Sequence, residues 1–169
     1  MRSVALVGVE STGKTELSQA IATKLDGLWV PEFARTYLDQ LGRPYQEEDL
    51  VEIAKGQLHQ QKNAMGSAKE LIVFDTDLLV LKVWSEFKYG RVNSFILDAW
   101  KTHRADFYIL PFYDVPFEED PLRENPNDRP ELFAIYENEL KVAGLQYRIV
   151  RGAREERLAQ ACAALNKKA

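Results

Sequence analysis

Short apolar runs alternate with longer amphipathic stretches along most of the chain. The five apolar runs are Val4–Val7, Leu28–Val30, Leu71–Phe74, Phe107–Leu110 and Tyr147–Val150. Runs of this length, rich in aliphatic and aromatic residues, are typical of strands that are buried on both faces. Long segments with helical character separate them, apart from the short connection before the second run. The alternation predicts an α/β fold in which helices cover both faces of a five-stranded parallel sheet.

Helical periodicity identifies five of the connecting or terminal segments. We expect helices over Glu16–Leu25, Gln46–Met65, Asp77–Tyr89, Asp128–Ala143 and Arg154–Leu165. The helix over 77–89 has little polar face, and such a helix is either buried or covers a ligand pocket.

The segment 111–130 interrupts this alternation. It holds five of the seven prolines, six acidic residues and two arginines. Its aromatic residues Phe112, Tyr113 and Phe117 argue against plain disorder, and a long loop inside a compact domain is usually functional. Because it follows the fourth strand at the edge where α/β sheets bind ligands, we predict a lid. We expect this lid to belong to a single domain that spans residues 1–169.

Composition and charge exclude several classes of protein. The 169 residues are 46% hydrophobic and 28% charged, which is ordinary for one globular domain. A net charge of -4 argues against a general nucleic-acid binder. The only cysteine, Cys162, excludes disulfides within the chain and a cysteine-rich metal site. There is no signal-peptide pattern and no apolar run long enough for a membrane span, so we expect a cytoplasmic protein without membrane contact. A homo-oligomer is compatible with the sequence.

The strongest motif lies between the first strand and the first helix. Gly8-Val9-Glu10-Ser11-Thr12-Gly13-Lys14-Thr15 matches the phosphate-loop pattern G-x-x-x-x-G-K-[ST] at every fixed position. A glycine-rich turn at a helix N-terminus directs backbone N–H groups toward phosphate oxygens. Lys14 would reach the β- and γ-phosphates, and the Thr15 hydroxyl would bind Mg²⁺. The motif therefore predicts a nucleoside triphosphate site, with ATP and Mg²⁺ as the expected cofactors.

The residues after the third strand indicate what happens to the γ-phosphate. Asp75 ends an apolar run and would support the metal beside the phosphate loop. Thr76 follows it, where hydrolytic enzymes often have a water-activating glutamate, and Asp77 would point into the cleft and bind a substrate hydroxyl. The guanine-reading N-K-x-D pattern is also missing from the sequence. These features favour a phosphotransferase over a switch or a motor.

Several further residues are candidates for the acceptor side and the transferred phosphoryl group. Glu32 immediately follows the second strand, and Arg35 comes three residues later. Small-molecule kinases need an acid near the acceptor hydroxyl and a cation near the transferred phosphoryl group, and these two residues could supply them. The alternative is that Glu32 only favours a helix dipole. Arg123 and Arg129 of the lid could close over the phosphates, or they could form surface ion pairs with the acids of the same segment.

Arg151 and Arg154 follow the last strand, where a P-loop fold commonly places the adenine. The start of an amphipathic helix would explain these two arginines equally well.

Three segments together resemble the ribosylnicotinamide kinase domain of NadR-type proteins: Gly8–Thr15, Pro-Glu-Phe-Ala-Arg at Pro31–Arg35, and Phe-Asp-Thr-Asp at Phe74–Asp77. The resemblance implies a deoxynucleoside-kinase-like P-loop fold with strand order 2-3-1-4-5. It also implies transfer of the ATP γ-phosphate to the 5′-hydroxyl of nicotinamide riboside. The H-x-G-H element of the adenylyltransferase domain of those proteins does not occur, so the resemblance concerns the kinase step.

Two other hypotheses remain open from the sequence. One is a regulatory ATP- or GTP-binding module that hydrolyses its nucleotide slowly. The other is a kinase of a different nucleoside or nucleotide. The sequence also leaves open whether Glu32 or Asp77 is the catalytic base.

Overall fold

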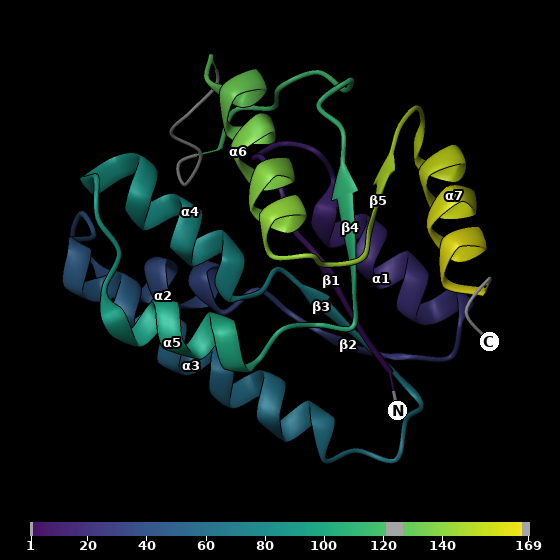
Figure 1. Ribbon diagram of the computed structural model, residues 1–169, viewed down its shortest axis with the longest axis horizontal. Helices are drawn as coiled ribbons and strands as arrows, with labels where there is room; N and C mark the ends of the chain where they lie inside the picture. Colours follow the sequence, from purple (N-terminus) through teal and green to yellow (C-terminus); the bar gives the residue numbers. More distant parts are fainter. Residues whose placement is uncertain (1, 121–126, 167–169) are drawn as a thin grey trace.

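The computed structural model describes residues 2–120 and 127–166, and its centre is a five-stranded parallel sheet (Figure 1). The strands are β1 (Arg2–Leu6), β2 (Leu28–Val30), β3 (Leu71–Asp75), β4 (Phe107–Pro111) and β5 (Tyr147–Val150). Their order is β2-β3-β1-β4-β5, and every pairing is parallel. The predicted fold class and strand order are confirmed.

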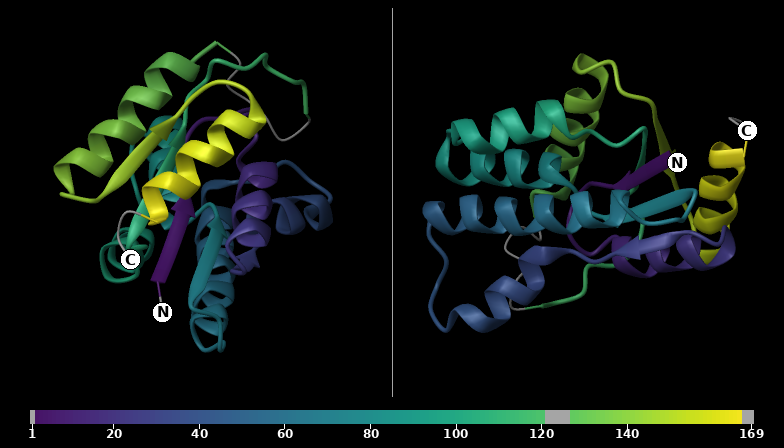
Figure 2. Two further views of the ribbon diagram at one scale, coloured as in Figure 1. Left: turned by 90° about the vertical axis from the view of Figure 1, so that its right-hand side faces the viewer. Right: turned by 90° about the horizontal axis from the view of Figure 1, so that it is seen from below.

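Helices form the two outer layers (Figure 2). They are α1 (Lys14–Lys24), α2 (Phe33–Leu41), α3 (Glu47–Met65), α4 (Leu78–Tyr89), α5 (Ser94–Thr102), α6 (Arg129–Val142) and α7 (Arg154–Asn166). Helices α1 and α7 lie side by side on one face of the sheet, and α3, α4, α5 and α6 pack over the other. This is the three-layer α/β/α arrangement that the alternating pattern predicts.

The continuous apolar strands follow from burial on both faces. In β1, Val4 and Leu6 belong to the hydrophobic cluster beneath α1 and α7, whereas Ala5 belongs to the cluster on the opposite face. Successive side chains of a strand point to opposite sides, so a strand between two helical layers needs apolar residues at every position. The same division holds along β3 and β4.

Helix α5 was not among the expected helices, although its signals are present in the sequence. The Asn93 side chain caps it by accepting a hydrogen bond from the Phe95 amide at 2.9 Å. Ile96, Ala99 and Trp100 form its buried face at helical spacing. A nine-residue helix with three buried positions gives too weak a periodicity to stand out beside its longer neighbours.

A buried carboxylate ties the far end of α2 to α3. Asp49 accepts two hydrogen bonds from the Arg43 guanidinium, one from the Tyr37 hydroxyl and one from the Gln46 amide. The hydrogen bonds from Arg43 are the main reason why the pKa of Asp49 is lowered. This network holds α2, whose other end lies at the candidate site, against the body of the protein.

The proline-rich connection is shorter than the expected lid. Pro111 is the last residue of β4, and α6 already begins at Arg129, so the loop runs from 112 to 128. Residues 121–126, including Arg123, lie outside the described residues. Among the described helices, none is long and apolar enough to cross a membrane.

Candidate functional site

The phosphate loop leaves β1 in a tight turn that only small residues allow. Gly8 has φ +131°, and a Cβ there would lie 2.9 Å from the Leu110 side chain. Gly13 has φ +72° and directly precedes α1. A Cβ at Gly13 would meet no protein atom within 4 Å, so the left-handed backbone conformation is what favours glycine there. The backbone amides of the first turn of α1 therefore lie beside open space that can receive phosphate.

Polar contacts hold the loop in this shape. The Lys14 Nζ donates to the carbonyl oxygens of Gly8 at 2.9 Å and Val9 at 2.7 Å. The Thr12 hydroxyl donates to the Val9 carbonyl at 2.9 Å. Lys14 is thus folded over its own loop, with its ammonium group at the position from which it can turn toward a bound phosphate.

Asp75 meets the requirements of a metal-supporting acid. It is 1% exposed, and among the described residues its Oδ1 has no hydrogen-bond partner. Burial raises the pKa of Asp75, while the neighbouring Thr15 hydroxyl and the charge of Lys14 lower it. A buried carboxylate oxygen without a donor is costly unless a cation or a water completes it. The pair Thr15 and Asp75 therefore fits Mg²⁺, a hard cation that takes oxygen ligands and keeps bound waters.

A cavity of about 720 Å³ extends from the phosphate loop across the carboxyl edge of the sheet. Its first end is lined by residues 8–17 together with Arg154 and Arg157. Its second end lies between α2, α4 and α6 and is mainly apolar. The side chains there are Ala34, Leu38, Val80, Val83, Trp84, Phe87, Leu132 and Tyr136. Helix α4, expected to be buried or to cover a pocket, does both.

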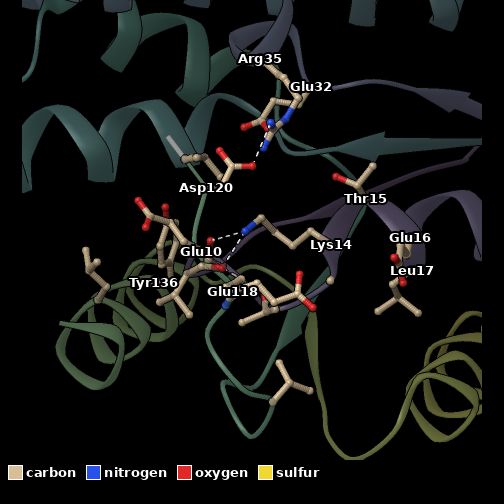
Figure 3. A pocket seen from close by; sticks show the side chains of 18 of the residues that line it. Glu10, Lys14, Thr15, Glu16, Leu17, Glu32, Arg35, Glu118, Asp120 and Tyr136 are labelled. Carbon is tan, nitrogen blue, oxygen red and sulfur yellow. Dashed lines mark hydrogen bonds and ion pairs between the residues drawn. The ribbon is translucent and has the colours of Figure 1, made fainter. Parts of the chain in front are cut away.

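Glu32 and Arg35 line the same cavity and lie beside Asp120, across from Lys14 (Figure 3). Glu32 is the N-cap of α2, but its side chain makes no capping hydrogen bond. Burial raises the pKa of Glu32, Asp75 and Asp120 raise it further, and the charges of Lys14 and Arg35 oppose the rise. Arg35 donates to Asp120 of the lid at 3.2 Å. The structure therefore brings an acid with an elevated pKa and a cation beside the phosphate loop.

The first part of the lid rests on the phosphate loop itself. The Glu118 amide donates to the Ser11 hydroxyl at 2.7 Å. Val115, Pro116, Glu118 and Asp120 of this segment line the cavity.

Asp77 does not point into the cleft, contrary to the expectation from its spacing after Asp75. Its Oδ1 accepts from the Leu79 amide at 2.9 Å and caps α4, and its Oδ2 accepts from the Tyr108 hydroxyl at 2.8 Å. Thr76 takes a positive φ of +74°, so the chain turns sharply and the alternation of the strand is lost. Burial raises the pKa of Asp77 to about 6, against the lowering effect of its two donors.

Arg129 also lies elsewhere than expected. It is the first residue of α6, is buried, and donates to the carbonyl oxygens of Tyr113 at 3.0 Å and Val115 at 2.9 Å. Arg129 therefore supports the backbone of the lid, and it does not line the cavity. Among residues 2–120 and 127–166, its guanidinium forms no ion pair with a carboxylate of the lid.

Of the two arginines after β5, only Arg154 lines the cavity. It lies 4.0 Å from the Glu16 carboxylate at the phosphate end. The Arg151 guanidinium instead stacks over the Phe112 ring, 3.5 Å from its centroid. The structure thus places Arg151 beside the root of the lid.

Arg157 is a site residue that the sequence analysis missed. Its guanidinium donates to the carbonyl oxygens of Thr12 at 2.7 Å, Gly152 at 2.7 Å and Phe112 at 2.9 Å, and it also pairs with Asp114. One side chain, 3% exposed, thereby joins the phosphate loop, the β5–α7 turn and the root of the lid. Its position one turn into a polar helix looks like that of a surface arginine, so nothing local in the sequence marks it.

A phosphate loop after the first strand, an acid at the end of its neighbour and a lid at the same edge define a P-loop fold of the nucleoside- and nucleotide-kinase type. A family model described as "AAA domain" matches residues 3–157, so the chain belongs to that family. Among curated proteins the sequence has no significant match.

Solved structures of NadR are similar to this chain over 98% of its length. A NadR complex with NAD and AMP-PNP has a TM-score of 0.82 and 18% identity, and a complex with NR has a TM-score of 0.84 and 20% identity. The chain spans about half of those proteins, 49% and 51% of their length. Deoxyadenosine kinase from M. mycoides and thymidylate kinase from Ehrlichia chaffeensis match with TM-scores of 0.67 and 0.72, at 17% and 10% identity. Each of these two matches covers 98% of this chain. The matched part is 99% of the deoxyadenosine kinase and 98% of the thymidylate kinase. At these identities the likeness establishes the fold.

The position of Asp77 predicts a role in stability. We expect Asp77→Ala to lower the free energy of unfolding by about 2–4 kcal/mol, because α4 loses its cap and the buried Tyr108 hydroxyl loses its acceptor. Asp77→Asn keeps an oxygen for the Leu79 amide and should lose less. Urea unfolding measures both, and calorimetric titration with ATP should give unchanged affinity. Normal stability combined with lost ATP binding in Asp77→Ala would contradict this assignment.

The contacts of Arg157 predict that it supports the nucleotide end of the cavity. A lysine cannot reach all four acceptors, so Arg157→Lys should lower the free energy of unfolding by about 2–4 kcal/mol. We also expect ATP to bind about 10-fold more weakly, since loss of a positioned hydrogen bond costs roughly 1.4 kcal/mol. Thermal unfolding and calorimetry test the two effects. The matched control is Arg148→Lys on the exposed side of β5, and equal behaviour of the two variants would refute the role.

Proposed function

We propose that this protein is a Mg·ATP-dependent kinase that phosphorylates the 5′-hydroxyl of a nucleoside, and that the nucleoside is nicotinamide riboside. The observation that supports this most is one continuous cavity that is lined by the phosphate loop, by apolar side chains of α2, α4 and α6, and by Glu32. A cavity of this size suits two ligands that meet end to end.

The phosphate end would hold the triphosphate of ATP. Its oxygens would accept from the loop amides, and Lys14 would exchange the Gly8 and Val9 carbonyls for the β- and γ-phosphates. Thr15 and Asp75 would hold Mg²⁺, which when bound neutralises charge on the β- and γ-phosphates. Arg154 would lie near the nucleotide, and Arg151 is a candidate for the adenine side through its stacking on Phe112.

The second end suits a flat, uncharged or cationic group. Its walls include Trp84, Phe87 and Tyr136, which can enclose a planar ring. The acids Glu32 and Asp120 line the cavity there, and their negative charge would disfavour a phosphorylated acceptor. The nicotinamide ring of the riboside carries a positive charge, which this field would favour. The similarity of the chain to NadR supports the same acceptor.

Glu32 would act as the base in the transfer. Its carboxylate accepts the proton of the 5′-hydroxyl as the hydroxyl oxygen forms a bond to the γ-phosphorus. The bond between that phosphorus and the bridging oxygen breaks, and ADP leaves. Arg35 would release Asp120 and stabilise the transferred group, with Arg123 of the lid a candidate for the same role. Catalysis then consists of positioning and electrostatic stabilisation.

The reaction can be tested directly. Incubation with Mg·ATP and a panel of nucleosides and nucleoside monophosphates should yield nicotinamide mononucleotide from nicotinamide riboside, detected by mass. A different phosphorylated product would keep the kinase and change the acceptor. ADP without any phosphorylated acceptor would favour the regulatory module instead. Cytoplasmic location and homo-oligomerisation stay predictions.

The role of Glu32 is tested by Glu32→Gln. We expect kcat to fall by about 100- to 10,000-fold with KM for ATP nearly unchanged, since the variant keeps the volume and loses the proton acceptor. In the wild type, kcat/KM should rise with pH through a pKa above that of an ordinary glutamate, because only ionised Glu32 accepts a proton and burial raises its pKa. That acidic limb should vanish in the variant. Glu52→Gln, exposed on α3, is the control, and near-normal kcat in Glu32→Gln would remove Glu32 as the base.

A further inference from the structure

The connection between β2 and α2, which carries Glu32, is held in place by residues of another helix. One residue, Pro31, separates the end of β2 from Glu32, and α2 begins at the next residue, Phe33. The position of the Glu32 backbone therefore depends on how the first turn of α2 is fixed.

Gln57 of α3 fixes the backbone of that turn. Its Oε1 accepts the Phe33 amide at 2.8 Å, and the side chain is 2% exposed. The first amides of a helix lack partners within the helix, and the side chain of the N-cap residue commonly accepts from one of them. Here the N-cap residue is Glu32, whose side chain makes no such bond. Gln57 provides an acceptor in its place, and the Glu32 carboxylate is left for the cavity.

Gly56, the preceding residue, fixes the Phe33 side chain. A Cβ at Gly56 would lie 2.1, 2.3 and 2.4 Å from three atoms of the Phe33 ring. The ring therefore rests directly on the backbone of α3. Glycine destabilises a helix interior relative to alanine, so its presence at position 56 needs a reason. That reason is the space which the missing Cβ leaves for the Phe33 ring.

We propose that Gly56 and Gln57 are positioning residues that hold Glu32 in place for the transfer, one by seating the Phe33 ring and the other by accepting the Phe33 amide. This inference rests on the proposed role of Glu32 as the base. Both residues act through Phe33.

Two variants test the proposal by kinetics. Gln57→Leu removes the acceptor, and Gly56→Ala displaces the ring. Each should lower kcat about 10- to 100-fold, as expected for a misplacement of about 1 Å, and leave KM for ATP within about twofold. Gln61→Leu, a buried glutamine one turn further along α3, and Gly66→Ala, at the end of the same helix, are the matched controls. Unchanged kcat in both test variants would overturn the proposal.

A rescue separates positioning from general damage. Alanine lacks all three ring atoms that a Cβ at Gly56 would meet, so adding Phe33→Ala to Gly56→Ala should restore kcat to within about threefold of Phe33→Ala alone if the ring is what displaces Glu32. No recovery, with the double variant as stable as the wild type, would overturn the role of Gly56.

Carboxyl NMR separates failure of this inference from failure of the kinase assignment. The Glu32 signal, assigned with Glu32→Gln, should titrate at lower pH in Gln57→Leu, because a carboxylate that turns back to cap α2 gains a donor that favours its charged form. If the Glu32 signal shifts in Gln57→Leu but the wild type has no kinase activity, the positioning role is kept and the kinase assignment is rejected. If the wild type is an active kinase but Gln57→Leu has an unshifted Glu32 signal and a normal kcat, the kinase assignment is kept and the positioning role is rejected.

Discussion

Parallel pairing of the five strands is the constraint on which the candidate site depends. Because the strands run in one direction, the phosphate loop after β1, Glu32 after β2 and Asp75 at the end of β3 all lie at one edge of the sheet. The central place of β1 puts the phosphate loop between the acids on one side and the lid after β4 on the other.

Buried polar side chains then convert this rough arrangement into a site with fixed geometry. Arg157 ties the phosphate loop to the lid root, and Gln57 takes over the capping of α2. Arg129 holds the lid carbonyls in the same manner. In each case a buried donor or acceptor meets a backbone group that would be costly to leave unpaired. These residues hold loops and the start of α2, whereas the apolar clusters hold the bodies of the helices.

Comparison of Asp75 with Asp77 shows what a local pattern can and cannot predict. Both acids stand in one short motif, and the strand that precedes them was evident from its apolar run. The left-handed turn at Thr76 separates their environments, so that Asp75 remains beside Thr15 and Asp77 becomes the cap of α4. Alternation along a strand predicts a shared direction only while the strand continues. Arg129 and Arg157 show the complementary case, since their partners are distant backbone carbonyls that no sequence spacing reveals.

The sequence by itself determined the fold class, the positions of the five strands and the phosphate loop, because each is encoded by neighbouring residues: apolar runs for strands buried on both faces, and glycines where the backbone must turn tightly. Its periodicity also gave the long helices, but the nine-residue helices α2 and α5 were not among those it predicted. The tertiary structure decided which acid faces the cavity. It also decided which arginines bind backbone carbonyls and which lie beside the cavity. The contact of the lid with Ser11 is a third outcome of this kind. Those outcomes depend on contacts between segments far apart in the chain, and such contacts exist only after the sheet has brought the segments to one edge.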